Sequence, residues 1–272
     1  MDYLGQEVLD QLDQEVREFL LQTSILDRLN GPLCETATRI PNSQEILEDL
    51  EANHLFILAL DQERTWYRYH RLCKEYLLKT LHIEKPGLEV ELHLRASSWF
   101  HQQGNLDEAI THALAAEDHK RVINLIDEVA LQKLQQSETS SLLRWIEALP
   151  EDVIEQHPTL CLTHAWALIL RGGPLEKVES RLAIIEQGSG NDRLLGSAAA
   201  IRSLLASLDG RPHESLKFSQ RASDLVPEDD LFTRSLLRDN LGMVNLMLGD
   251  FRAAVDNFAL AVELSQKTGN LM

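Results

Sequence analysis

The fold is indicated most directly by the stretch Leu248-Gly249-Asp250-Phe251-Arg252-Ala253-Ala254. This stretch has the pattern of a helix hairpin: one helix ends at a glycine, and a second helix, which carries alanines, starts directly after it and packs antiparallel to the first. The pattern occurs at three earlier places, at Gln103–Ala109, Arg171–Glu176 and Asp209–Glu214. The turn glycines Gly104, Gly172, Gly210 and Gly249 are 68, 38 and 39 residues apart, and 68 is two units of 34. A period of about 34–40 residues is typical of stacked helix pairs, so the sequence predicts an array of helix hairpins.

The last copy of this pattern resembles a tetratricopeptide repeat. It has Gly242 in its first helix, Gly249 at the turn, and Ala254, Phe258 and Ala261 in its second helix. The small residues let the two helices approach closely, and the large ones fill the groove between them. No polar capping helix is evident before the chain ends at residue 272, and terminal repeats normally need a polar outer face. We therefore expect the array to be truncated here.

A different pattern comes before the repeats. The sequence predicts an amphipathic helix over about Gln6–Leu26 and a second helix over Gln44–Asn53. A β-hairpin follows, with strands rich in β-formers around a polar turn, and then a helix over about His70–Leu81. The predicted strands are Leu55–Leu60 and Thr65–Tyr69. This order of elements over about 80 residues predicts a small winged-helix-like domain.

The fold class is therefore mainly α, with a winged-helix-like domain followed by an α-solenoid of tetratricopeptide-like hairpins. We place the winged-helix-like domain at residues 1–85, a helical arm with the first degenerate repeats at 86–150, and superhelical sensor repeats at 151–272.

The charge of the chain argues against binding to nucleic acid. The formal net charge is −17, from 43 acidic and 26 basic side chains. The second predicted helix, which would be the recognition helix of a DNA-binding winged helix, carries Glu45, Glu48, Asp49 and Glu51 and no base. Phosphate backbones would be repelled. We expect no direct binding of nucleic acid by this chain, and no association with an anionic membrane.

No motif in the sequence indicates catalysis. There is no phosphate-binding loop, nucleophile elbow or His-Glu-x-x-His sequence, so we expect no enzymatic activity. Glu108 and His112 are four residues apart, with His101 and His119 nearby, but no third metal ligand is forced close. We interpret them as solvent-exposed polar residues and expect no metal site. Three widely spaced cysteines and an N-terminus without a signal sequence favour the cytoplasm.

The first 130 residues carry several longer runs that resemble one family. The runs are Glu15–Cys34 (EVREFLLQTSILDRLNGPLC), Leu50–Phe56 (LEANHLF), Trp66–Leu72 (WYRYHRL), Leu94–Phe100 (LRASSWF) and Gly104–Ala116 (GNLDEAITHALAA). In this order they resemble the segment after the ATPase core in MalT-like transcription activators of the LuxR family. These regulators belong to the STAND class of signal-transducing NTPases.

The resemblance implies a longer architecture than this chain contains. It consists of a nucleotide-binding domain, a winged helix that packs on it, a helical arm, a repeat-built sensor and a C-terminal helix-turn-helix. The first and last are missing here, so ATP or ADP is expected in the full-length protein and no cofactor in this segment.

One residue role also follows from the resemblance. In related STAND proteins a Met-His-Asp motif, at the start of the last winged-helix helix, contacts the β-phosphate of ADP. Tyr69-His70-Arg71 is similar in position, which makes His70 the candidate nucleotide-sensing residue. Arg71 stands where the family has Asp, which puts the geometry of such a contact in doubt. The alternative is that His70 only satisfies the N-terminus of a helix.

The resemblance implies a signal-sensing and relay segment of an ATP-dependent LuxR-type regulator. Its partners would be a small-molecule inducer or a regulatory protein, bound by the repeats, and the missing ATPase and DNA-binding domains. The alternative is an autonomous repeat scaffold that docks proteins and has no nucleotide switch. Sequence does not identify the inducer, the residues that bind it or the oligomeric state.

Overall fold

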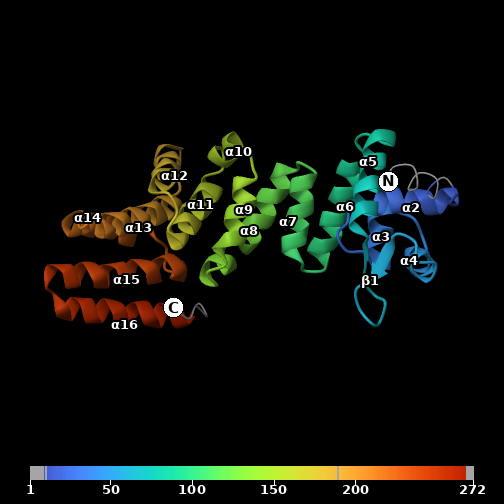
Figure 1. The fold of residues 1–272 in the computed structure, drawn as a ribbon. Helices are drawn as coiled ribbons and strands as arrows, with labels where there is room; N and C mark the ends of the chain where they lie inside the picture. The colour runs from blue at the N-terminus through green and yellow to red at the C-terminus, as the bar shows by residue number, and fades with distance from the viewer. Residues whose placement is uncertain (1–8, 10, 189, 268–272) are drawn as a thin grey trace. The chain divides into compact units, whose positions relative to one another are not determined.

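The computed structural model describes Leu9, residues 11–188 and residues 190–267. The chain forms two compact units, Met1–Leu125 and Ile126–Met272 (Figure 1). The fold class is as predicted: helices make up most of the described residues, and one two-stranded antiparallel sheet lies in the first unit. The three-part division at residues 85 and 150 remains a prediction from sequence.

The first unit begins with three helices, a hairpin and a further helix; the prediction had two helices before the hairpin, and the short helix α3, which starts at the Gly31-Pro32 break, was missed. The predicted helix over about Gln6–Leu26 is shorter in the structure: it begins at Gln14 after the N-cap Asp13 and ends at Thr23, and residues 11–13 and 24–26 are not helical. The predicted start at Gln6 itself lies outside the described residues. The elements are α2 (Gln14–Thr23), α3 (Gly31–Thr38), α4 (Ser43–Ala52), β1 (Ile57–Ala59), β2 (Tyr67–Tyr69) and α5 (Arg71–Glu84).

The hairpin was predicted correctly, but its strands are shorter than expected. They pair in the register Ile57↔Tyr69, Leu58↔Arg68 and Ala59↔Tyr67. Phe56, with φ 64°, lies in the left-handed region and ends β1 on its N-terminal side. The connecting loop is held by Asp61, whose carboxylate accepts hydrogen bonds from the backbone N of Thr65 (2.8 Å), its hydroxyl (2.6 Å) and the N of Trp66 (3.0 Å). These bonds, led by that of the Thr65 hydroxyl, lower the pKa of Asp61.

The inner face of the hairpin closes the core of the winged-helix domain. Tyr67 and Tyr69 are both buried, and the Tyr69 hydroxyl lies 2.6 Å from the hydroxyl of Thr23 on α2. Trp66 points the other way, as the alternation of side chains along a strand requires. The core around the tyrosines is aliphatic and aromatic, and includes Phe19, Leu20, Leu33, Leu47 and Leu77.

The first helix hairpin completes this unit. It consists of α6 (Leu88–Gln102) and α7 (Leu106–Ala115) and is followed along the chain by α8 (His119–Gln135). The second unit contains α9 (Thr139–Glu147), α10 (Glu151–Glu155) and three hairpins. These are α11 (Pro158–Arg171) with α12 (Leu175–Gly188), α13 (Asp192–Leu208) with α14 (Pro212–Leu225), and α15 (Leu231–Leu248) with α16 (Phe251–Lys267).

The turn glycines act as the sequence predicts. Gly104, Gly172, Gly210 and Gly249 all have positive φ, between 69° and 80°. A side chain in that conformation would be strained, so glycine ends each first helix and lets the chain reverse. In the second unit the first helix of each hairpin packs on the first helix of the next: α11 packs on α13, and α13 packs on α15. This is the arrangement expected for stacked repeats.

The hairpins are held together by close approach and by a buried polar cluster. A Cβ built on Gly242 of α15 would lie 2.5 Å from the ring of Phe258 on α16, so only glycine fits there. Between the last two hairpins, the hydroxyl of Ser203 lies 3.0 Å from that of Ser215 and 2.7 Å from that of Ser219. The amide of Asn240 on α15 donates to Ser203 (2.7 Å) and Ser215 (3.3 Å). All four residues are buried, and we call them the serine cluster.

None of the helices in the described part of the chain is both long enough and apolar enough to cross a bilayer.

Ala254 tests the packing of the last hairpin. Its side chain is fully buried, so Ala254→Leu should overpack the interface and lower the free energy of unfolding by about 1–3 kcal/mol. Urea denaturation followed by circular dichroism measures the change. Ala259→Leu, on the exposed face of the same helix, is the matched control and should change the free energy by about 0.5 kcal/mol or less. Equal effects of the two variants would contradict the assigned packing.

Candidate functional site

His70 lies where the hairpin meets the last helix of the winged-helix domain. Its backbone N donates to the carbonyl of Phe56 (2.8 Å), and its carbonyl accepts from the N of Lys74 (3.0 Å). It is the N-cap residue of α5, but its side chain makes no capping hydrogen bond and is exposed. The alternative in which the imidazole satisfies the helix N-terminus therefore has no hydrogen bond to support it. The role in nucleotide sensing stays a prediction.

His70 shares one face of the hairpin with exposed apolar side chains. Because Leu58 pairs with Arg68 and the backbone of Phe56 with that of His70, the side chains of Leu58, Leu60, Arg68 and His70 lie on the same outer side. We call these four residues the hairpin face. Leu58 and Leu60 are 39% and 42% exposed, and Leu72, in the first turn of α5, is 55% exposed. An exposed apolar group of this kind is typical of a contact surface.

Trp66 connects the hairpin to the first helix pair. Its ring meets Trp99 of α6 edge-to-face at 6.5 Å, and the guanidinium of Arg28 lies 5.6 Å from its centroid. Arg28 also pairs with Glu108 of α7 at 3.5 Å. The hairpin is thus fixed on one side to α6 and α7. Trp99 is half-buried in this contact.

His112 is not the solvent-exposed residue that the sequence suggested. It is 6% exposed, and its Nδ1 lies 2.8 Å from Nδ1 of His93 on α6. The ring of Phe100 stacks on it at 5.4 Å. Helical spacing places Glu108 near His112 in sequence, but the structure pairs Glu108 with Arg28. The partner, His93, is 19 residues away, and spacing within one helix could not have indicated it.

The histidine pair is held neutral by its surroundings. Burial, with further contributions from nearby charges, lowers the pKa of His93 and of His112 to about 4. The charge of Lys74 adds to this lowering, and that of its ion-pair partner Asp27 opposes it; both residues belong to the winged-helix domain. With both rings neutral, one Nδ1 donates its proton and the other accepts it.

A second buried polar group lies in the second unit and was also missed from sequence. Arg181 of α12 is 2% exposed, and its Nε donates to Nδ1 of His164 on α11 (3.1 Å). Its Nη2 donates to Glu151 of α10 (2.9 Å). Burial, and then the charge of Arg181, lowers the pKa of His164 to about 4. The group ties three helices together through one guanidinium.

Within the ranges that the structure describes, no three histidine, cysteine or carboxylate side chains are grouped as metal ligands would be. Cys34 and Cys161 are buried and Cys73 is half-buried, and all three are free thiols.

The fold defines the class of protein first. A STAND protein with a tetratricopeptide repeat sensor from Pyrococcus horikoshii has a similar fold. That crystal structure matches 99% of this chain and 47% of its own, with a TM-score of 0.63 and 13% identity. At that identity the likeness concerns the fold alone.

The family follows from closer relatives. Residues 5–89 match the family model of the MalT winged helix domain. The HTH-type transcriptional regulator MalT of Vibrio parahaemolyticus is 30% identical over 264 residues, covering 93% of this chain and 29% of that protein. The serine/threonine-protein kinase PknK of Mycobacterium tuberculosis is 35% identical over 173 residues, covering 64% of this chain and 16% of the kinase. Residues 5–89 are therefore similar to the MalT winged helix domain, and the chain is similar to MalT-type regulators, of whose length it spans less than a third.

The histidine pair predicts how stability depends on pH. An unfolded histidine has a pKa of about 6.5, whereas folded His93 and His112 titrate near 4. As the pH falls below about 6.5, the unfolded chain takes up protons that the folded chain does not, so the free energy of unfolding decreases, and it continues to decrease down to about pH 4. Urea unfolding at pH 7 and pH 5 should show this loss.

The double variant His93→Gln, His112→Gln should lose less stability between those two pH values than the original chain. His213→Gln, at an exposed position, is the control and should leave the difference unchanged. A double variant with the same loss as the original chain would contradict the assignment.

Proposed function

We propose that this chain is the signal-sensing and relay segment of an ATP-dependent LuxR-type transcription regulator in the cytoplasm. The segment itself would carry no enzymatic activity, no cofactor and no nucleic-acid contact. It would pass a binding event on the repeats to an ATPase domain and a DNA-binding domain of the same protein. The similarity to MalT over 93% of the chain supports this role.

The hairpin face is the observation that carries the proposal. Leu58, Leu60 and His70 are uncovered beside the start of α5, where another domain could pack. An ATPase domain packed on this face would bury Leu58 and Leu60 and bring the uncapped imidazole of His70 to a nucleotide. Arg71 takes the place of the family's Asp, and its guanidinium is paired with Glu75 at 2.9 Å, so only the histidine of the motif is carried over.

The repeats would receive the signal, as an inducer or as a regulatory protein. To move a switch from about 1:99 to 99:1, binding must favour the active state by roughly 5.5 kcal/mol. The match to PknK supports a regulatory segment that works with more than one kind of output, because that relative is a protein kinase.

An autonomous protein-docking scaffold is the second candidate, and one observation favours it. On α16, Phe251, Val255 and Val262 are 69%, 66% and 56% exposed and follow one another at helical spacing. Such an apolar stripe fits a protein partner better than a small polar inducer.

Thermal-shift screening tests the sensor role of the repeats. A panel of sugars, amino acids and small signalling metabolites should contain a ligand that raises the melting temperature of the chain. At about 100 times its dissociation constant such a ligand adds roughly 2.7 kcal/mol to the stability. A panel without any shift would count against a small-molecule inducer and leave a regulatory protein as the signal.

His70 is tested in the longer protein, with the ATPase domain present. Loss of a hydrogen bond from His70 to a phosphate should cost about 1.5–3 kcal/mol, so His70→Ala should weaken ADP binding about tenfold or more. Equilibrium binding of a fluorescent ADP analogue measures this. His54→Ala, at an exposed position in the same domain, is the control. Unchanged ADP affinity in His70→Ala would remove His70 from the nucleotide site.

A further inference from the structure

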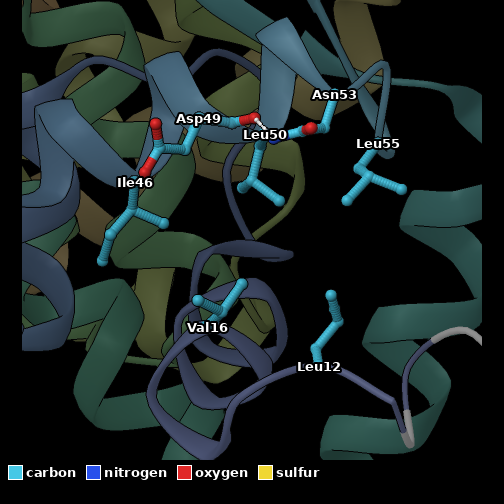
Figure 2. Close-up of a pocket in the computed structure, with 7 residues that line it drawn as sticks. All are labelled: Leu12, Val16, Ile46, Asp49, Leu50, Asn53 and Leu55. Carbon is cyan, nitrogen blue, oxygen red and sulfur yellow. Dashed lines mark hydrogen bonds between the residues drawn. The ribbon is translucent and has the colours of Figure 1, made fainter.

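A pocket lies in the winged-helix domain between α2 and α4. Its volume is about 170 Å³. Figure 2 shows the aliphatic side chains of both helices and of the segment after α4 converging on this space. The lining residues are Leu12, Val16, Ile46, Leu50 and Leu55, with Asp49 and Asn53 at the polar edge.

The size of the pocket limits what can occupy it. Sites for metabolites and drug-sized ligands usually enclose about 300–1,000 Å³. A cavity of about 150 Å³ lined by similar side chains holds benzene. The pocket is therefore too small for most metabolites and has the size of one large apolar side chain, such as phenylalanine or leucine.

The surface beside the pocket is acidic. The pocket edge is formed by α4, which contains no basic residue and on which Glu45 and Asp49 are exposed on or beside the lining side. Glu48 lies on the other side of α4, where it accepts a hydrogen bond from Gln44. The Asn53 side chain donates to the backbone carbonyl of Asp49 (2.7 Å) and leaves the Asp49 carboxylate open at the rim (Figure 2). Among the described residues, no ion pair involves Glu45, Glu48 or Asp49. An occupant of the pocket thus meets an apolar interior and uncompensated negative charge at its entrance.

We infer that this pocket anchors a basic segment of a partner protein. One large apolar side chain of the segment fills the pocket, and flanking arginines or lysines lie over the exposed carboxylates of α4. Such an anchor residue, surrounded by charge-complementary contacts, is how a small interface concentrates its binding energy. The site contains no residue of the hairpin face and does not depend on the nucleotide switch proposed above.

Peptide titration followed by methyl NMR of the 272-residue chain tests the inference. The probe is a phenylalanine flanked on each side by two arginines. It should shift the methyl signals of Val16, Ile46, Leu50 and Leu55. Replacing the phenylalanine of the probe by alanine should weaken binding about tenfold, because the anchor is lost. Replacing its arginines by glutamates should abolish binding at the same concentrations.

Two variants of the chain separate the pocket from the charge. Val16→Phe fills the pocket and should abolish the preference for the phenylalanine probe over the alanine one. Its matched control is Val90→Phe, at an exposed position of α6, which should leave that preference intact. Asp49→Lys, at an exposed position that does not threaten folding, should weaken binding of the probe about fivefold.

Two results would overturn the inference. Equal binding of the phenylalanine and alanine probes would show attraction by charge alone. Methyl shifts as large with n-hexylamine as with the peptide, at equal concentration, would assign the pocket to a small amphiphilic cation instead of a protein segment.

Discussion

Close approach of paired helices at small residues is the constraint on which the repeat part of this structure depends. Gly242 leaves no room for a Cβ against Phe258, and each first helix ends at a glycine whose positive φ reverses the chain. Apolar faces can then be buried only between neighbouring helices. Surface side chains remain free to vary around this frame, which explains how relatives near 30% identity match over most of the chain.

The turn glycines and the β-hairpin could be predicted from sequence because both are local. A left-handed turn needs glycine, and a strand pair needs β-formers around a polar turn. The short length of β1 could not be predicted, because the left-handed backbone at Phe56 depends on its surroundings. The contact of His93 with His112, and that of His164 with Arg181, join different helices. Spacing along one helix cannot indicate such contacts, and His112 was therefore taken for a surface residue.

The role of His70 stays a prediction, made from the family resemblance and from its place after the hairpin. The exposed leucines beside it became visible only with the strand register. The hairpin presents His70 in a fixed position, because the preceding Tyr69 is buried and contacts Thr23 while Trp66 is packed on Trp99. Its inner face thus serves the core, and on its outer face Trp66 packs on Trp99 while Leu58, Leu60 and His70 stay exposed. The pocket beside α4 had no sequence signal, since its five aliphatic residues come from three segments.

The serine cluster has a mechanical consequence. An interface of aliphatic side chains alone can slide by a fraction of an ångström with little loss, because dispersion contacts are non-directional. Hydrogen bonds from Asn240 to Ser203 and Ser215 are directional. Sliding α15 along α13 would leave the buried amide of Asn240 without a hydrogen-bond partner, which costs about 1–3 kcal/mol. The last two hairpins therefore resist sliding past each other, so a force on α16 would move both hairpins together.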